Sequence, residues 1–197
     1  MEFNESKTKE NLARAFAGLC QDGARYQFIA KSAFSEGYAY ISDLMVRFAK
    51  NKMAHASTLY RTMIDKINKS KDNVKIEAGY PFEDHILKTS LLDSAEIEEY
   101  QSKNVYPHFA KIAKDEGFLD IEKYFSLIAK VGEENSLKLR FLADKFENKS
   151  LYKREQKTKW ICSNCGHSEE SKQAWETCPL CNYPKGYVVI AKDTKTK

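Results

Sequence analysis

Four cysteines near the end of the chain constrain its fold more tightly than any other feature. They form two Cys-x-x-Cys pairs, Cys162 with Cys165 and Cys178 with Cys181, and twelve residues separate the pairs. Two such pairs at this spacing are typical of one tetrahedral metal site with four thiolate ligands. A bound metal can fold a segment that is too short to build its own core, so we expect a small metal-binding unit over residues 160–197.

The rest of the chain is long enough for one larger domain. Of 197 residues, 42% are hydrophobic, which supports a packed core. We predict a domain over residues 1–150, a basic linker over 151–159 and the metal-binding unit after it. The stretch 149–159 carries five bases against one acid. It is either a solvated linker or a surface that steers an acidic redox partner toward the metal unit.

Several classes of partner and location are disfavoured by the sequence. No apolar run approaches the length of a membrane span, so we expect no membrane partner. No basic surface with interleaved aromatic residues accompanies this stretch, so we expect no nucleic acid either. The polar N-terminus is unlike a signal peptide, and we predict a cytoplasmic protein, in which cysteines stay reduced and favour metal ligation over disulfides.

Apolar residues recur at helical spacing in four stretches of the first 150 residues. The expected inward positions of the first two helices are Leu12, Phe16, Leu19, Gly23, Tyr26 and Ala30, then Ile41, Leu44, Phe48, Lys52, His55 and Leu59. Those of the third and fourth are Ile97, Gln101, Asn104, His108 and Ile112, then Ile121, Phe125, Ile128, Gly132, Asn135, Leu139 and Leu142. Glu-Gly turns close the first and third helices, and an irregular connection over residues 66–92 links the pairs. This order predicts a mainly α protein with a ferritin-like four-helix bundle.

With these elements in place, the chain resembles the rubrerythrin family, in which a ferritin-like di-iron bundle precedes a rubredoxin-like domain. The segments that carry the resemblance are 11–18, 24–26, 36–38, 55–56, 106–113, 116–118, 160–166, 178–181 and 183–187. The resemblance implies a homodimer. It also implies peroxide reduction, with electrons passing from a thiolate-bound iron to the di-iron centre.

The di-iron ligands that the resemblance implies are almost all missing. Seven positions of this sequence correspond to ligands, and only one keeps a ligand side chain, His55. The seven are Leu19, Lys52, His55, Gln101, Asn104, Gly132 and Asn135. Leucine, glycine and amide side chains cannot replace carboxylates, and a lysine ammonium repels a divalent cation. We therefore expect no di-iron centre and no catalytic residue in the bundle.

Lys52 has two interpretations. It fills the volume and charge of the missing metals, bonded to Gln101, Asn104 and Asn135 with a carboxylate or water nearby, or it reaches out to solvent at the helix edge. Asp22 is expected elsewhere on its helix.

The neighbouring side chains have ordinary structural interpretations. We expect Glu98 and Glu99 to be solvated and His55 to be a hydrogen-bonded core histidine. Tyr26 and Tyr106 are predicted to be core tyrosines with bonded hydroxyls, and Cys20 to be inert.

Three functions remain open from the sequence. The first is electron transfer or binding by a protein with a single four-cysteine iron. The second is a peroxide-scavenging oxidoreductase with displaced ligands such as Glu133, Glu134, His108 or Asp22. The third is a structural zinc protein that pairs with an intact homologue.

The neighbours of the cysteines favour iron, although zinc can substitute for it. They are Trp160, Gly166, Trp175, Pro179, Tyr183 and Tyr187. Asn182 stands where such a turn needs a positive φ angle. We expect a homodimer and a redox protein as donor or acceptor.

Overall fold

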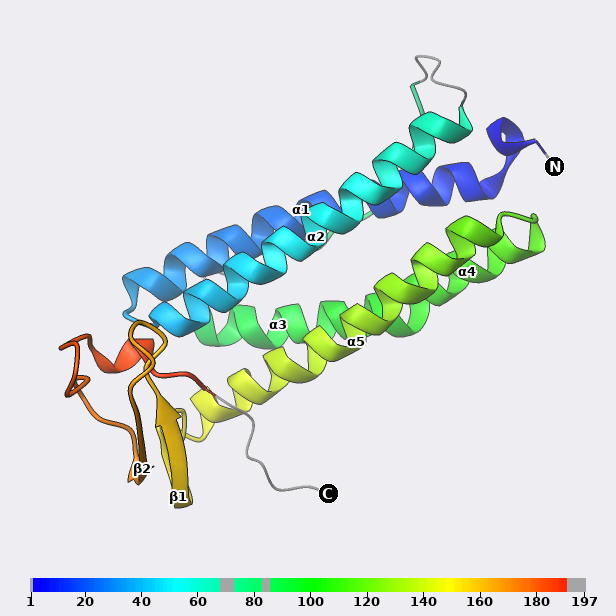
Figure 1. Ribbon diagram of the computed structural model, residues 1–197. Helices are drawn as coiled ribbons and strands as arrows, with labels where there is room; N and C mark the ends of the chain where they lie inside the picture. Colours follow the sequence, from blue (N-terminus) through cyan, green and yellow to red (C-terminus); the bar gives the residue numbers. More distant parts are fainter. Residues whose placement is uncertain (1, 68–72, 83–85, 191–197) are drawn as a thin grey trace.

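The computed structural model describes residues 2–67, 73–82 and 86–190. Long helices run side by side as a bundle, and a small two-stranded unit lies at one end of it (Figure 1). The bundle helices are α1 (Lys7–Ser35), α2 (Ala39–Lys66), α3 (Leu87–Tyr100), α4 (Tyr106–Asp115) and α5 (Leu119–Glu147). A π-helical segment, Gln101–Val105, joins α3 directly to α4, so these two make a single third rod. The predicted four-helix arrangement is therefore confirmed.

Both short turns form where the Glu-Gly pairs predict them. Gly37 and Gly117 adopt φ angles of 85° and 90°, a region that favours glycine. The residue after each glycine donates its backbone N–H to the helix it leaves, from Tyr38 to Ala33 and from Phe118 to Ala113, both at 2.8 Å. Such hydrogen bonds satisfy carbonyls at the helix ends and reverse the chain within a few residues.

The third rod differs from its prediction in start and in register. It begins at Leu87, inside the stretch that was expected to be irregular. Its inward residues are Leu91, Ser94, Ala95, Glu98, Ser102, Tyr106, Ala110 and Ala113. From Glu98 to Ala110 these lie four residues apart, because the π-helical segment has more residues per turn than an α-helix. The predicted face was therefore wrong, and Asn104 and His108 are exposed.

The core of the bundle has two hydrophobic halves. One half lies near the α1–α2 turn and includes Ile41, Leu44, Leu91 and Leu139. The other lies near the α4–α5 turn and includes Leu12, Leu19, Leu59, Ile121 and Phe125. Between the two halves, α1, α2, α3 and α5 each contribute a buried polar residue: Asp22, Lys52, Glu98 and Asn135. A polar layer thus crosses the middle of the bundle.

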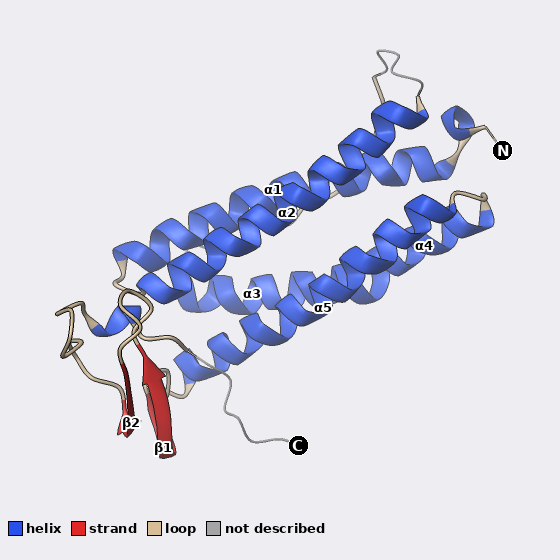
Figure 2. Cartoon of the chain, in the orientation of Figure 1, coloured by secondary structure: helices blue, strands red, loops and turns tan. Residues whose placement is uncertain are grey.

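The two-stranded unit follows α5 without a free linker. Strand β1 (Lys153–Ile161) pairs antiparallel with β2 (Ser168–Gln173), as Figure 2 shows. Most of the segment expected to be a linker is β1, and the guanidinium of Arg154 lies 5.1 Å from the centre of the Trp160 ring. A short 3₁₀ helix, Lys185–Tyr187, completes the unit.

Close contacts fix this unit to the end of the bundle. Leu151 and Ile190 are buried in the hydrophobic half beside the α1–α2 turn. Gly186 approaches the turn so closely that a Cβ atom there would lie 1.7 Å from the carbonyl oxygen of Gly37. Only glycine fits at residue 186 without moving the unit. None of the helices in the described part of the chain is long and apolar enough to span a membrane.

Candidate metal centre

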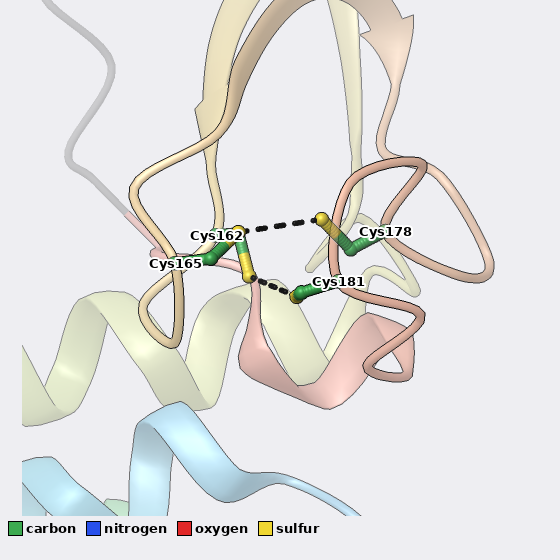
Figure 3. A group of neighbouring side chains, drawn as sticks. All are labelled: Cys162, Cys165, Cys178 and Cys181. Carbon is green, nitrogen blue, oxygen red and sulfur yellow. Dashed lines mark hydrogen bonds between the residues drawn. The ribbon is translucent and has the colours of Figure 1, made fainter.

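The four cysteine sulfurs come together at the tip of the two-stranded unit. All four lie within 4.8 Å of one another. The Sγ atoms of Cys162 and Cys181 are 3.7 Å apart, as are those of Cys165 and Cys178 (Figure 3). Four sulfurs that surround a zinc ion at about 2.3 Å have edges of about 3.8 Å, whereas a disulfide needs about 2.05 Å. The spacing fits one tetrahedral metal ion and does not fit two disulfides.

The local backbone explains how each pair of cysteines is held. Each pair wraps into a tight turn in which the residue after its second cysteine donates to the carbonyl of its first, Gly166 to Cys162 and Asn182 to Cys178, both at 2.9 Å. Gly166 and Asn182 have φ angles of 77° and 59°. The positive φ expected at Asn182 is confirmed, and asparagine tolerates this conformation.

Hydrogen-bond donors point at the sulfurs that lie nearer the surface. Burial alone would raise the pKa of Cys181, but the backbone N–H of Tyr183 and the Asn164 side chain lower it to about 6. The backbone N–H of His167 donates to Cys165 in the matching position of the other turn, and this bond lowers the Cys165 pKa, while burial and the three neighbouring sulfurs raise that pKa to about 12. Such donors stabilise thiolates and tune a bound metal. The donor set suits a single iron or zinc ion.

The centre of the polar layer is Lys52, whose side chain is buried. Its Nζ atom lies 2.9 Å from both carboxylate oxygens of Glu98 and 3.2 Å from Oδ2 of Asp22. Burial alone would lower the Lys52 pKa, but the Glu98 and Asp22 carboxylates raise it above its ordinary value. The group is therefore a buried ammonium ion. The interpretation in which it reaches out to solvent is wrong.

The two carboxylates have further partners. The Tyr26 hydroxyl donates to Glu98 Oε1 at 2.6 Å, and Asn135 Nδ2 donates to the same oxygen at 3.3 Å. Gln101 Nε2 donates to Asp22 Oδ1 at 3.4 Å, and the Arg25 guanidinium pairs with that oxygen. Two cations, Lys52 and Arg25, thus balance two anions. Charges paired in this way are far less costly to bury than an unpaired charge.

The predicted partners of Lys52 were only partly right. Gln101 and Asn135 belong to the polar layer, but they bind the carboxylates rather than the ammonium. Asn104 is exposed, and its side chain donates to the Tyr100 carbonyl at 3.3 Å.

The other positions that the resemblance assigned to di-iron ligands have structural surroundings of their own. Leu19 is fully buried in a hydrophobic half of the core. A Cβ atom at Gly132 would lie 3.1 Å from Glu98 Oε2, so the glycine leaves the space that the Glu98 carboxylate occupies. His55 is half-buried, and its Nδ1 has no hydrogen-bond partner within the described residues. Burial, and then Lys52, lower its pKa, which favours the neutral imidazole.

Glu98 and Asp22 are the site residues that the sequence analysis misplaced. Glu98 is 1% exposed and Asp22 2% exposed, whereas both were expected to lie away from the site. An unbroken period of 3.6 residues puts Ile97 inward and Glu98 outward, whereas in the structure Glu98 is buried and Ile97 is half-buried. The useful signal was Lys52 itself, because a buried ammonium requires a carboxylate on a facing helix. Glu99 is partly exposed and pairs with Arg140 at 2.8 Å.

The predicted tyrosines and the fifth cysteine have ordinary environments. Tyr26 is a core tyrosine with a bonded hydroxyl, as expected. Tyr106 is also buried, and its ring stacks on Phe125 with centroids 6.4 Å apart. Cys20 is half-buried, and burial raises its pKa, which makes the thiol less reactive.

The displaced ligands that a functional di-iron centre would use are not gathered. Glu133, Glu134 and His108 are exposed, and Asp22 is engaged by Lys52 and Arg25. Within the described residues, the four cysteines are the only group of three or more histidine, cysteine or acidic side chains arranged to hold an ion. A lysine ammonium at the centre of the polar layer does not fit a pair of divalent cations.

The chain matches known proteins over nearly its whole length. The family model for rubrerythrin matches residues 10–158, and the model for the rubredoxin-like domain of rubrerythrin matches residues 160–188. Rubrerythrin of Clostridium perfringens is 35% identical over 192 residues, 96% of each chain. Nigerythrin of Nitratidesulfovibrio vulgaris is 27% identical over 189 residues, 90% of this chain and 83% of that protein.

Solved structures agree with the fold. Partially reduced nigerythrin superposes with a TM-score of 0.61 at 22% identity, covering 95% of this chain and 90% of that one. Bacterioferritin of Desulfovibrio desulfuricans superposes with a TM-score of 0.56 at 15% identity, covering 73% and 85%. The ferritin-like bundle and the rubredoxin-like four-cysteine unit are thereby confirmed, and the chain belongs to the rubrerythrin family.

Proposed function

We propose that this chain carries a single iron, held by Cys162, Cys165, Cys178 and Cys181, and that it transfers single electrons rather than reducing peroxide at a di-iron centre. The observation that carries the proposal is the Lys52 ammonium, bound to Glu98 and beside Asp22 where the family resemblance implies metals. The proposed centre can accept one electron from a donor and pass it to an acceptor.

Electrostatics in the bundle supports the absence of a di-iron centre. The buried carboxylates of Glu98 and Asp22 are already neutralised by Lys52 and Arg25. A metal ion could use these oxygens only after both cations had left them. Breaking a buried ion pair typically costs about 3–5 kcal/mol. Exposed Glu133, Glu134 and His108 offer no compensating ligands inside the bundle, so peroxide reduction with displaced ligands is the weaker alternative.

The cysteine unit offers what a one-electron carrier needs. Iron bound by four thiolates supplies a ferric–ferrous couple, tuned by hydrogen bonds to the sulfurs. The backbone N–H groups of Tyr183 and His167 supply such bonds here. Leu180, between the second pair of cysteines, is 65% exposed and offers a contact surface for a redox protein. An electron can therefore enter and leave at the tip of the unit without crossing the bundle.

Within one chain, the point where the two-stranded unit docks lies well away from Lys52 along α2. The unit contacts the bundle at Gly37 and Ala39, at the start of α2. Lys52 lies thirteen residues further along that helix, which is about 20 Å at 1.5 Å per residue.

We also propose that the protein is a homodimer. The family resemblance implies one, and the outer face of α1 and α2 supports it. A groove of about 650 Å³ on that face is lined by Phe34, Val46 and Met53, each more than a third exposed. A second copy would cover this apolar surface. Light scattering on the purified chain should give twice the monomer mass, and a monomer at all concentrations would overturn the proposal.

Metal content, colour and electron uptake together test the function. We expect one iron per chain, the visible absorption of a ferric thiolate centre, and uptake of one electron per chain in a reductive titration. Peroxide consumption should equal that of a Cys178→Ser control. About three irons per chain with peroxide turnover would instead support the displaced-ligand enzyme. A colourless protein purified with zinc, which takes up no iron on reconstitution, would support a structural protein that pairs with an intact homologue.

A further inference from the structure

A second cavity lies beside the polar layer and is unrelated to the cysteines. It has a volume of about 900 Å³ and lies between α1, the connection over residues 73–82, α3 and α4. This size is typical of pockets for small organic molecules. Its inner wall includes Gln101, whose amide also reaches Asp22 in the polar layer. We call this space the acidic cavity because of the carboxylates in its wall.

The connection that walls the acidic cavity is held in place. Three hydrogen bonds link it to α1: from Arg14 Nε to the Glu77 carbonyl at 3.1 Å, from Gln21 Nε2 to the Pro81 carbonyl at 2.9 Å, and from the Tyr80 hydroxyl to the Arg14 carbonyl at 3.3 Å. Because this wall is already ordered, ligand binding does not have to include the entropy cost of ordering it.

The charge of the cavity is opposite to that of the protein. The chain carries a net charge of +4, yet Glu77, Asp93 and Glu96 line the cavity against a single base, Arg14. Glu77 and Glu96 are exposed, which places them at the rim. Carboxylates attract a cation and repel phosphates or other carboxylates. The wall therefore excludes nucleotides and organic acids as ligands.

Aromatic rings make up much of the remaining wall. The lining aromatic residues are Tyr80, Phe82, Tyr100, Tyr106 and Phe109. Tyr106 is buried and Phe109 half-buried, whereas Tyr100 and Phe82 are exposed. Rings attract a cation over their faces and also pack against a flat apolar group. The acidic rim and the buried rings together favour a ligand with its charge outside and its apolar part inside.

We propose that the acidic cavity binds a small organic molecule with a protonated amine and a flat apolar body. The amine lies at the rim near Glu77 and Glu96, and the apolar body lies deeper, against Tyr106 and Phe109. Neither the metal of the cysteine unit nor the proposed electron transfer enters this argument.

Three probes of one shape test the charge preference: phenethylamine, 2-phenylethanol and phenylacetate. Binding to the full-length, metal-loaded chain is measured by calorimetry or ligand-observed NMR. An exposed ion pair and a cation–π contact each contribute about 0.5–1 kcal/mol, so we expect the amine to bind about five- to tenfold more tightly than the alcohol. The acid should bind least. Equal affinity for the three probes, or no binding of the amine, would overturn the proposal.

Two substitutions of Gly18, which lines the cavity, test whether the amine binds there. A Cβ atom at Gly18 would lie 3.5 Å from the Tyr80 ring, an ordinary contact, so Gly18→Ala should keep amine binding. Gly18→Leu should put a branched side chain into the cavity beside the Tyr80 ring and weaken amine binding. Unchanged binding to Gly18→Leu, with the helical content of the native protein, would contradict the proposed location.

Substitutions that remove rim charges test the electrostatic part of the proposal without changing the shape of the cavity. The pair Glu77→Gln and Glu96→Gln should bring amine affinity down to that of the alcohol. The matched pair Glu133→Gln and Glu134→Gln alters exposed acids on α5, outside the cavity, and should leave amine affinity unchanged. An equal loss in both pairs would mean a general charge effect and would overturn the proposal.

Discussion

The cysteine unit and the polar layer of the bundle both concentrate acidic groups in a small volume, but they neutralise them differently. The unit gathers four thiols at the spacing of metal ligands, and an external metal cation would hold them together as thiolates. The polar layer places its own cation, Lys52, between Glu98 and Asp22. The difference supports our proposal that an internal ammonium takes the place of metals in this ferritin-like bundle.

The two regions also differ in how the chain builds them. The cysteines lie within twenty residues and are held by two local turns. The polar layer draws Asp22, Lys52, Glu98 and Asn135 from α1, α2, α3 and α5. Losing the metal should therefore affect only the small unit, whereas losing Lys52 should destabilise the whole bundle.

The largest effect is expected when one metal ligand is removed. Cys178→Ser takes away a buried thiolate, and structural four-ligand metal sites contribute about 10–16 kcal/mol to folding of their domains. We expect metal content to fall from one per chain toward zero and the unit to unfold, while the bundle keeps its helical circular dichroism. The matched control Cys20→Ser should keep the metal. Retention of metal by Cys178→Ser would contradict the assignment of the ligands.

Removal of the internal cation should have the next largest effect. Lys52→Met leaves Glu98 and Asp22 buried beside an apolar side chain, and we expect the free energy of unfolding to fall by about 3–5 kcal/mol. Chemical denaturation measures the loss. Lys130→Met, a change at an exposed lysine of α5, is the control and should change little.

A second substitution makes the Lys52 result specific. Adding Glu98→Gln to Lys52→Met removes one orphaned charge, so the double variant should be more stable than the sum of the two single losses predicts. Strict additivity would show that the two side chains do not interact.

Disrupting the contact between the cysteine unit and the bundle is expected to have a smaller effect than either of the two changes above. Gly186→Ala would place a Cβ atom 1.7 Å from the Gly37 carbonyl oxygen, and such crowding costs about 1–3 kcal/mol. The unit should separate from the bundle and become more sensitive to proteolysis, yet still bind one metal. Gly79→Ala, where a Cβ atom meets nothing within 4 Å, is the control. Unchanged protection of Gly186→Ala would disprove the docked arrangement.

The smallest expected effect concerns His55. Burial and Lys52 lower its pKa, so the folded protein favours the neutral imidazole. Below the ordinary histidine pKa of about 6.5 the unfolded chain takes up the proton more readily, and stability therefore falls as pH falls. His55→Gln should flatten this decline below about pH 6.5 in denaturation curves. A control, His108→Gln at an exposed histidine, should keep the native slope.

Much of the structure could be predicted from local sequence patterns. The cysteine spacing, the Glu-Gly turns and the inward position of Lys52 each depend on a few neighbouring residues. The predictions went wrong on the third rod, where the π-helical segment Gln101–Val105 shifts the register. A π-helical segment leaves no simple mark on apolar periodicity, so Glu98 was expected in solvent. Gly132 was predicted as a lost ligand position, but only the structure reveals that it makes room for that carboxylate.

Anomalous diffraction from crystals of the iron-reconstituted protein, recorded at the iron absorption edge, tests most directly whether Lys52 has replaced the di-iron centre. We expect one strong peak per chain, at the centre of Cys162, Cys165, Cys178 and Cys181, and no peak within the polar layer. Two further peaks beside Glu98 and Asp22, with the Lys52 side chain displaced, would contradict the proposal that an internal cation has taken the place of the metals.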